Sequence, residues 1–252
     1  MWKSPWAGFS NFVYLFKTKD AWLMTRNTIC YNAAFIALGT LLAVTVAIML
    51  NELKNRLAKN IYQIFILIPY LISMVVVSYI GYVFLATDAG FLNHVTGGST
   101  NWYGTPGAWP LILVVIYLWK SFGYNSIIYY ATVIGIDGSL YEAATIDGAT
   151  RWQRIKHVTL PGLKGTILTL VLLAIGKIFY SDFGLFYRVP MNSGLLYDAT
   201  MTIDVYVYRG LTQLNDIGRS SAAGFYQSML CFAVILTANA IVRKIDRENA
   251  LF

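Results

Sequence analysis

Long apolar runs, separated by short polar stretches, dominate the chain. Five of these runs are 21 residues or longer, the length that a helix needs to cross a hydrocarbon core of roughly 30 Å. The predicted spans are Asn27–Leu50, Ile61–Ala86, Trp109–Gly135, Leu163–Phe183 and Ala222–Val242. The pattern predicts an all-α, polytopic transmembrane protein with about five spans in this chain.

Two of the predicted spans contain residues that interrupt a regular helix. Pro69 lies inside the second span, where membrane proteins tolerate proline if neighbouring groups satisfy the freed carbonyl, and we expect a local kink there. The fourth span contains Gly176-Lys177 and then Ser181-Asp182. We expect its outer half to be irregular where it lines a cavity.

The distribution of basic residues predicts the orientation in the membrane, because cytoplasmic loops are enriched in Lys and Arg. Ten basic residues fall in the loops and tail predicted to lie inside: Lys54, Arg56, Lys59, Arg151, Arg154, Lys156, Lys164, Arg243, Lys244 and Arg247. The predicted outer loops, 87–108 and 184–221, contain only Arg188, Arg209 and Arg219. We therefore expect residues 27–242 to form the membrane domain and residues 243–252 a cytoplasmic tail.

Residues 1–26 are aromatic and amphipathic, as is typical of a segment at a membrane interface. Five spans with an inner C-terminus place this segment outside, although it carries Lys3, Lys17, Lys19 and Arg26. An external basic segment conflicts with the charge rule that the other loops obey.

Composition excludes several classes of protein. With 57% hydrophobic and 12% charged residues, the chain has too little polar surface for a soluble globule. The net charge of +7 follows from the basic loops, so it indicates topology and not nucleic-acid binding. Cys30 and Cys231 lie in apolar runs without ligands at metal spacing, which favours packing roles.

The chain contains no motif for bond chemistry. HExxH, GxSxG and CxxC are absent, and the two histidines, His94 and His157, fall on opposite predicted sides of the membrane. Gly176-Lys177 is no phosphate-binding loop, since position 171 is Val and position 178 is Ile. We expect no enzyme, no metal and no cofactor bound by this chain. An ion-gradient-driven secondary transporter remains an alternative, because Gly and Pro interruptions and buried charges suit it too.

One polar stretch, residues 137–162, lies between the third and fourth predicted spans. Ser139 and Glu142 have the spacing of a capping box, which predicts a helix start at Ser139. Asp147-Gly148 is a pair suited to a turn or to positive φ. Pro161 is expected to open the next membrane helix, where its missing N–H costs nothing.

A second short helix is predicted from Ala149 to His157. It carries three basic residues. Trp152 and Ile155 lie between them and form an apolar stripe that suits a partner's groove. A plain positive-inside loop is the alternative interpretation of such a basic helix.

The motif spacing in this stretch resembles the EAA signature of binding-protein-dependent ABC importer permeases. The matching residues are Glu142-Ala143-Ala144, Gly148 and Val158-Thr159-Leu160-Pro161. The flanking residues, Ile134–Asp137 and Asp147–Trp152, resemble the carbohydrate-importing branch of that family. Val158, where isoleucine is usual, and Ile155, where phenylalanine is usual, depart mildly from the pattern.

The resemblance implies a permease subunit in the cell membrane that translocates a sugar, with an oligosaccharide as the expected cargo. It implies four kinds of partner: a second related permease, two ATP-binding subunits that hold ATP-Mg, an extracytoplasmic solute-binding protein and the lipid membrane. The implied ATPase-coupling residues are Glu142, Ala143, Ala144, Asp147, Gly148, Ala149, Leu160 and Pro161. Because carbohydrate permeases usually have a helix before the segment like Gly8–Phe12, the chain is expected to lack the family's first helix.

Two lysines inside predicted spans are candidates for a substrate path. An uncompensated charge at the centre of a membrane costs on the order of 3 kcal/mol, so each needs a partner or water. Aromatic and polar neighbours suit a sugar path; the candidates are Trp119, Lys120, Tyr124, Lys177, Tyr180 and Asp182. The alternative is that each lysine snorkels or bonds a carbonyl and fixes helix packing.

Overall fold

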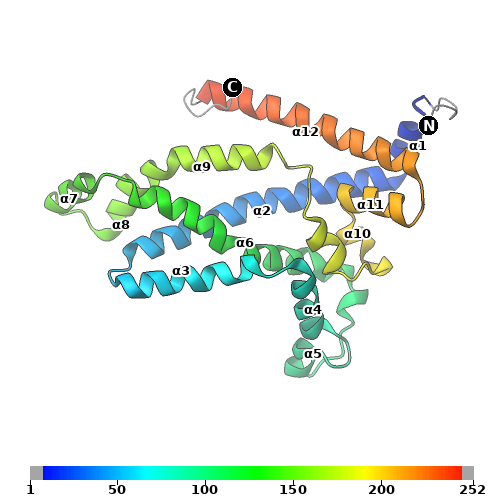
Figure 1. The fold of residues 1–252 in the computed structure, drawn as a ribbon, viewed down its shortest axis with the longest axis horizontal. Coiled ribbons are helices and arrows are strands. Elements are labelled where there is room, and N and C mark those ends of the chain that lie inside the picture. Colours follow the sequence, from blue (N-terminus) through cyan, green and yellow to red (C-terminus); the bar gives the residue numbers. More distant parts are fainter. Residues whose placement is uncertain (1–7, 246–252) are drawn as a thin grey trace. The chain divides into compact units, whose positions relative to one another are not determined.

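The computed structural model describes residues 8–245, so Lys3 of the N-terminal segment and Arg247 of the tail lie outside the described residues. The described part is helical and contains no β-strand, which confirms the predicted all-α class. Figure 1 labels the helices. They are α1 (Ser10–Lys17), α2 (Lys19–Glu52), α3 (Arg56–Leu71), α4 (Met74–Leu85), α5 (Phe91–Thr96), α6 (Trp109–Ile134), α7 (Gly138–Ile146), α8 (Arg151–Arg154), α9 (Leu160–Ile175), α10 (Tyr197–Thr200), α11 (Ile203–Thr212) and α12 (Ile217–Ile245).

Short helical segments complete the chain. Two π-helical segments cover Ile155–Thr159 and Gly184–Arg188, and three 3₁₀ turns cover Trp102–Gly104, Pro106–Ala108 and Gly194–Leu196. The predicted outer loop 184–221 therefore contains helical segments.

Among the described residues, four helical stretches are long and apolar enough to cross a membrane. They are Lys19–Glu52, Pro106–Ile134, Arg151–Ile175 and Ile217–Lys244. The number rises to five when the bent pair α3 and α4 is counted as one span. The prediction of about five spans is confirmed.

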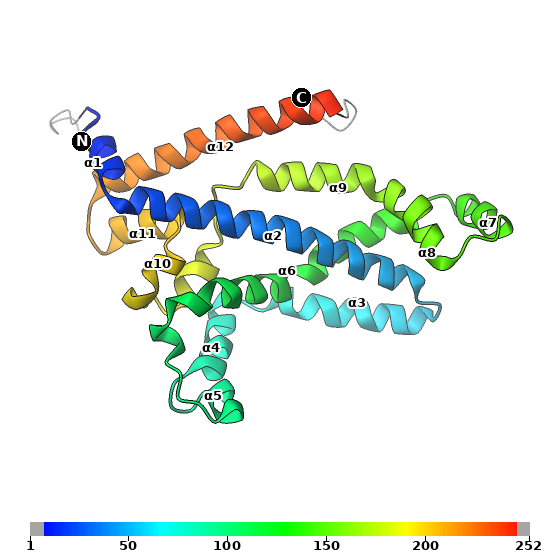
Figure 2. The ribbon, with the colours of Figure 1, turned by 180° about the vertical axis from the view of Figure 1, so that it is seen from behind.

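Helix α2 begins eight residues earlier than the predicted first span. It runs without a break over 34 residues, or about 51 Å at 1.5 Å per residue, and Figure 2 follows it along its whole length. It includes Trp22 and Arg26, which the sequence placed in the interfacial segment. A hydropathy pattern locates only the apolar part of a helix, whereas the helical backbone of α2 continues through the polar residues before it as far as Lys19.

The second predicted span is divided into α3 and α4. Pro69 lies inside α3, and the break comes three residues later, at Ile72-Ser73, where Ile72 has extended backbone angles. The Ser73 hydroxyl accepts a hydrogen bond from the N–H of Val76 at 3.4 Å and so caps α4. The predicted kink at Pro69 is therefore a full break at the next cap.

The fourth predicted span, Leu163–Phe183, has different limits in the structure. The helical backbone starts at Arg151 and α9 ends at Ile175, so Lys177 follows the helix and is not inside it. Residues 176–182 are turns and coil, which confirms the expected irregular outer half.

The chain divides into two compact units. Within the described residues, the first combines 8–33, 73–114 and 177–234, and its core is formed by Leu15, Ala21, Met24, Phe179, Ile203, Ala223 and Cys231. The second combines 34–72, 115–176 and 235–245, and its core is formed by Ala43, Val44, Ala47, Leu50, Tyr129, Tyr130, Val133 and Leu163. The polar stretch 137–162 lies wholly in the second unit.

Candidate functional site

The first helix of the polar stretch starts one residue before the predicted point and has a different cap. Helix α7 begins at Gly138, and the carboxylate of Asp137 accepts the N–H of Ser139 at 2.9 Å. This hydrogen bond lowers the pKa of Asp137. The predicted capping box of Ser139 and Glu142 is therefore wrong, because Asp137 is the better N-cap and leaves Leu140, not Glu142, at the third helical position.

The end of α7 is a Schellman motif built on Gly148. The N–H of Ala149 donates to the carbonyl of Ala144 at 2.9 Å, and the N–H of Gly148 donates to the carbonyl of Thr145 at 3.1 Å. Gly148 has φ +76°, which confirms the predicted positive φ. A Cβ added there meets no atom within 4 Å, so the position needs glycine for its backbone conformation and not for space.

The second helix starts at Arg151 and not at Ala149. Thr150 is its N-cap in a capping box with Gln153, whose side-chain oxygen accepts the N–H of Thr150 at 2.7 Å. The sequence T-x-x-Q carries the signature of this cap, and our interpretation overlooked it.

A π-helical turn joins α8 to α9. The N–H of Leu160 donates to the carbonyl of Ile155, and Pro161 follows in the first turn of α9. A widened turn here gives room for the proline ring, which clashes with a carbonyl four residues earlier in a regular helix. Pro161 therefore opens α9 as predicted, but on a helical backbone that already began at Arg151.

Side-chain contacts connect α7 to the elements around it. The hydroxyl of Tyr141 bonds that of Thr159 at 3.0 Å, and the guanidinium of Arg154 donates to the hydroxyl of Thr145 at 3.1 Å. Helices α7 and α8 are thereby held together as one body.

A salt bridge connects the same stretch to α2. Arg151 lies 2.6 Å from the carboxylate of Glu52, the last residue of α2. Both residues line an open pocket of about 430 Å³ with Tyr141 and Arg154. Glu52 lies 99 positions from Arg151 in the sequence, so no local pattern could have identified it.

The exposed surface of this stretch combines a free carboxylate with large apolar side chains. Glu142 is exposed and its carboxylate has no partner among the described residues. Ile146 is 86% exposed and Trp152 71% exposed, whereas Ile155 is buried. The predicted apolar stripe of Trp152 and Ile155 is therefore wrong, because the two side chains point to different environments. Exposed apolar groups beside an unpaired charge are typical of a binding surface.

Most of the other predicted coupling residues are at the surface too. Ala143, Asp147, Leu160 and Pro161 are exposed, and Ala144 and Ala149 are half-buried.

Lys120, on α6, is bound to the end of α3. Its ammonium group donates to the carbonyls of Tyr70 at 2.9 Å and Ile72 at 2.5 Å, with Pro69 at 3.4 Å. These carbonyls have no helical partners because α3 breaks after Leu71. The alternative interpretation of Lys120, a bond to carbonyls that fixes packing, describes this geometry.

Its neighbours on α6 also contact α3. The ring of Tyr124 stacks on that of Tyr70, with centroids 4.5 Å apart. A Cβ on Gly123 lies 1.7 Å from the carbonyl oxygen of Ile66, so the two backbones approach too closely for any other residue. Trp119 is 39% exposed. The sequence did not identify Gly123 as a packing position.

The remaining path candidates lie in the other unit, in the irregular segment after α9. Lys177 is exposed, and its ammonium group has no partner in the described part of the chain. Asp182 accepts the N–H of Leu185 at 3.1 Å and so caps the next helical turn. Tyr180 is 47% exposed. The structure thus gives Lys177 no structural contact of the kind that Lys120 has.

Three buried or half-buried polar side chains satisfy the open backbone of this segment. Asn32 donates to the carbonyls of Ile178 and Tyr180 at 2.8 and 3.0 Å, and Gln227 donates to that of Phe179 at 2.7 Å. The carboxylate of Asp204 accepts the N–H of Ser181 at 2.7 Å. Irregular backbone in a membrane protein requires such partners, but sequence reasoning missed all three because they come from distant helices.

Comparison with known proteins gives consistent matches. Residues 36–247 match the family described as the binding-protein-dependent transport system inner membrane component. The polygalacturonan/rhamnogalacturonan transport system permease protein YteP of Bacillus subtilis (strain 168) is 30% identical over 251 residues, covering 98% of this chain and 77% of that protein.

Two crystal structures resemble the fold. One is a bacterial ABC transporter involved in the import of the acidic polysaccharide alginate, with a TM-score of 0.91 and 28% identity over 97% of this chain and 86% of the other. The second is the bacterial alginate ABC transporter in complex with an alginate pentasaccharide-bound periplasmic protein. Its TM-score is 0.89 at 28% identity, covering 94% of this chain and 83% of the other.

Proposed function

Because the chain belongs to the binding-protein-dependent transport system inner membrane components, as the match over residues 36–247 establishes, we propose that it is the permease subunit of an ATP-driven importer of sugars. Its preferred cargo is an oligosaccharide delivered by an extracytoplasmic binding protein. The similar proteins are named for the transport of polygalacturonan and rhamnogalacturonan and for the import of alginate, and these names support a saccharide cargo. The chain itself performs no bond chemistry.

The observation that supports coupling is the exposed surface of α7 and α8. It offers a partner the unpaired carboxylate of Glu142 and the apolar side chains of Ile146 and Trp152. The hydrogen bonds that join α7 to α8, and the salt bridge of Arg151 with Glu52, connect that surface to α2. We propose that one of two cytoplasmic subunits carrying ATP-Mg docks here, and that a second related permease completes the translocation path.

The test is purification and transport. A tagged chain expressed with its chromosomal neighbours should co-purify with an ATPase and a second permease. In vesicles loaded with ATP, the complex should take up a labelled oligosaccharide when its binding protein is present, and uptake should stop when ATP is removed. Collapse of the proton and sodium gradients should leave uptake intact; uptake that follows the ion gradient instead identifies a secondary transporter and refutes this proposal.

A further inference from the structure

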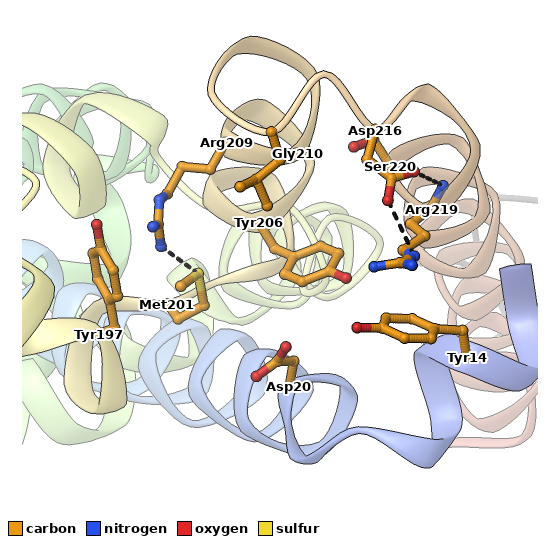
Figure 3. Close-up of a pocket in the computed structure, with 11 residues that line it drawn as sticks. Tyr14, Asp20, Tyr197, Met201, Tyr206, Arg209, Gly210, Asp216, Arg219 and Ser220 are labelled. Atoms are coloured by element: carbon orange, nitrogen blue, oxygen red, sulfur yellow. Dashed lines mark hydrogen bonds and ion pairs between the residues drawn. The ribbon is translucent and has the colours of Figure 1, made fainter.

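A second site lies in the predicted outer part of the chain, within the first unit. It is a pocket of about 280 Å³ between α1, the start of α2, the helices α10 and α11, and the first turns of α12 (Figure 3). None of the predicted coupling or path residues lines it.

Two arginines in the pocket are stacked on tyrosine rings. The guanidinium of Arg209 lies 3.6 Å from the centroid of Tyr197, and that of Arg219 lies 3.5 Å from the centroid of Tyr14. A stacked guanidinium is held in place by the ring. The Nε–H of Arg209 donates to the side-chain oxygen of Gln213 at 3.1 Å, and that of Arg219 lies 3.0 Å from Asp216. The remaining N–H groups at the two guanidinium edges are the ones that a ligand can bind. Both arginines are half-buried.

The charges in the pocket balance. The carboxylates of Asp20 and Asp216 line the same walls as the two arginines, and Asp216 lies 3.0 Å from Arg219. Donors and acceptors therefore occur together at zero net formal charge. This combination fits hydroxyl groups, which donate and accept at once, better than it fits a free anion.

Tyr206 adds an aromatic wall. It lies between the two stacked pairs in Figure 3, and burial raises the pKa of its hydroxyl, helped by the nearby Asp20. The hydroxyl therefore stays protonated at neutral pH and can donate a hydrogen bond. Three tyrosines with polar ends give the pocket both apolar faces and hydrogen-bonding groups.

Ser220 supplies an independent sign of a missing partner. The residue is 1% exposed, and its hydroxyl is the one buried side-chain polar atom without a hydrogen-bond partner among the described residues. The hydroxyl lies against Gly210, another residue of the pocket. Buried polar groups in native proteins are nearly always paired, so an orphan beside a pocket points to a ligand.

We propose that this pocket is a binding subsite for one hydroxylated sugar ring on the outer part of the permease. The inference rests on the proposed function for its substrate class. The volume is just under the roughly 300–1,000 Å³ of pockets for drug-sized ligands, so the subsite holds one ring of a chain and not a whole oligosaccharide. Arg209, Arg219 and Asp20 bind the hydroxyls, Tyr206 packs against the ring, and Ser220 completes its hydrogen bonds through the ligand.

The test measures sugar binding without transport. The complete complex in lipid nanodiscs, without ATP and without binding protein, is titrated with glucose, galactose, rhamnose and galacturonate, and saturation-transfer NMR reports binding. At least one neutral sugar should bind to the wild type. Ser220→Ala should weaken it about threefold to tenfold, the range for one hydrogen bond, and Arg209→Gln should weaken it at least tenfold. Arg188→Gln, which changes an exposed arginine outside the pocket, should bind as the wild type does.

The melting temperature separates this role from a purely structural one, in which Ser220→Ala would lower it. Without sugar, Ser220→Ala should melt at the wild-type temperature or above it, because the substitution removes an unpaired buried hydroxyl. The proposal is overturned if no neutral sugar binds, if only galacturonate binds, or if Ser220→Ala and Arg209→Gln bind as the wild type does. ATP-driven uptake by the wild type with no such binding refutes the subsite alone; absence of ATP-driven uptake refutes the proposed function alone.

Discussion

At the residue scale, Gly148 shows how one backbone angle defines the surface that we propose faces a partner. A residue with a side chain costs about 1–2 kcal/mol in the left-handed conformation, and a β-branched residue suffers most. Gly148→Val should therefore disturb the Schellman motif and the orientation of α8. We expect the purified complex to form with normal yield but to lose most of its sugar-stimulated ATPase activity.

The matched control is Gly148→Asn, because asparagine accepts positive φ more readily and nothing lies within 4 Å of the new Cβ. It should retain most of the stimulated activity. Equal stimulation in Gly148→Val and wild type argues against a coupling role for this helix end.

At the scale of elements, the junction of α3 with α6 depends on Lys120. Its ammonium group donates hydrogen bonds to carbonyls that have no helical partners because α3 breaks after Leu71. Because hydrogen bonds to a charged group contribute about 1.5–3 kcal/mol, Lys120→Met should destabilise the protein by about 2 kcal/mol. The melting temperature of the complex in detergent should fall and its yield should decrease.

Lys177→Met supplies the control, since Lys177 is also a lysine near a predicted span but has no such contact. It should melt as the wild type does. If Lys120→Met is equally stable and instead changes which sugars pass, Lys120 lines the path and its carbonyl contacts are dispensable.

At the scale of the whole molecule, the orientation in the membrane rests on the ten basic residues in predicted inner loops against three in outer loops. In a background with Cys30→Ala and Cys231→Ala, we expect Leu214→Cys to react with an impermeant maleimide on intact cells. Lys54→Cys should react only after permeabilisation. Both original side chains are exposed, so accessibility depends on the side of the membrane. The reverse labelling pattern contradicts the predicted topology.

The sequence alone determined the features that depend on local composition and short spacing. Apolar runs predicted the membrane helices because crossing a bilayer depends on length and hydropathy, and Asp147-Gly148 predicted a helix end because positive φ is a property of the residue itself. Their exact limits needed the structure: α2 extends to Lys19 and α9 ends at Ile175, since helix ends depend on caps and competing side-chain bonds.

Only the tertiary structure decided which polar groups meet. Lys120 donates hydrogen bonds to carbonyls about 50 positions away, and Arg151 forms a salt bridge with Glu52. Asp204 and Asn32 bond the backbone after α9. The pocket around Ser220 likewise joins helices from both ends of the chain. The sequence shows that each buried charge or open carbonyl requires a partner, but which partner it contacts depends on which helices pack together.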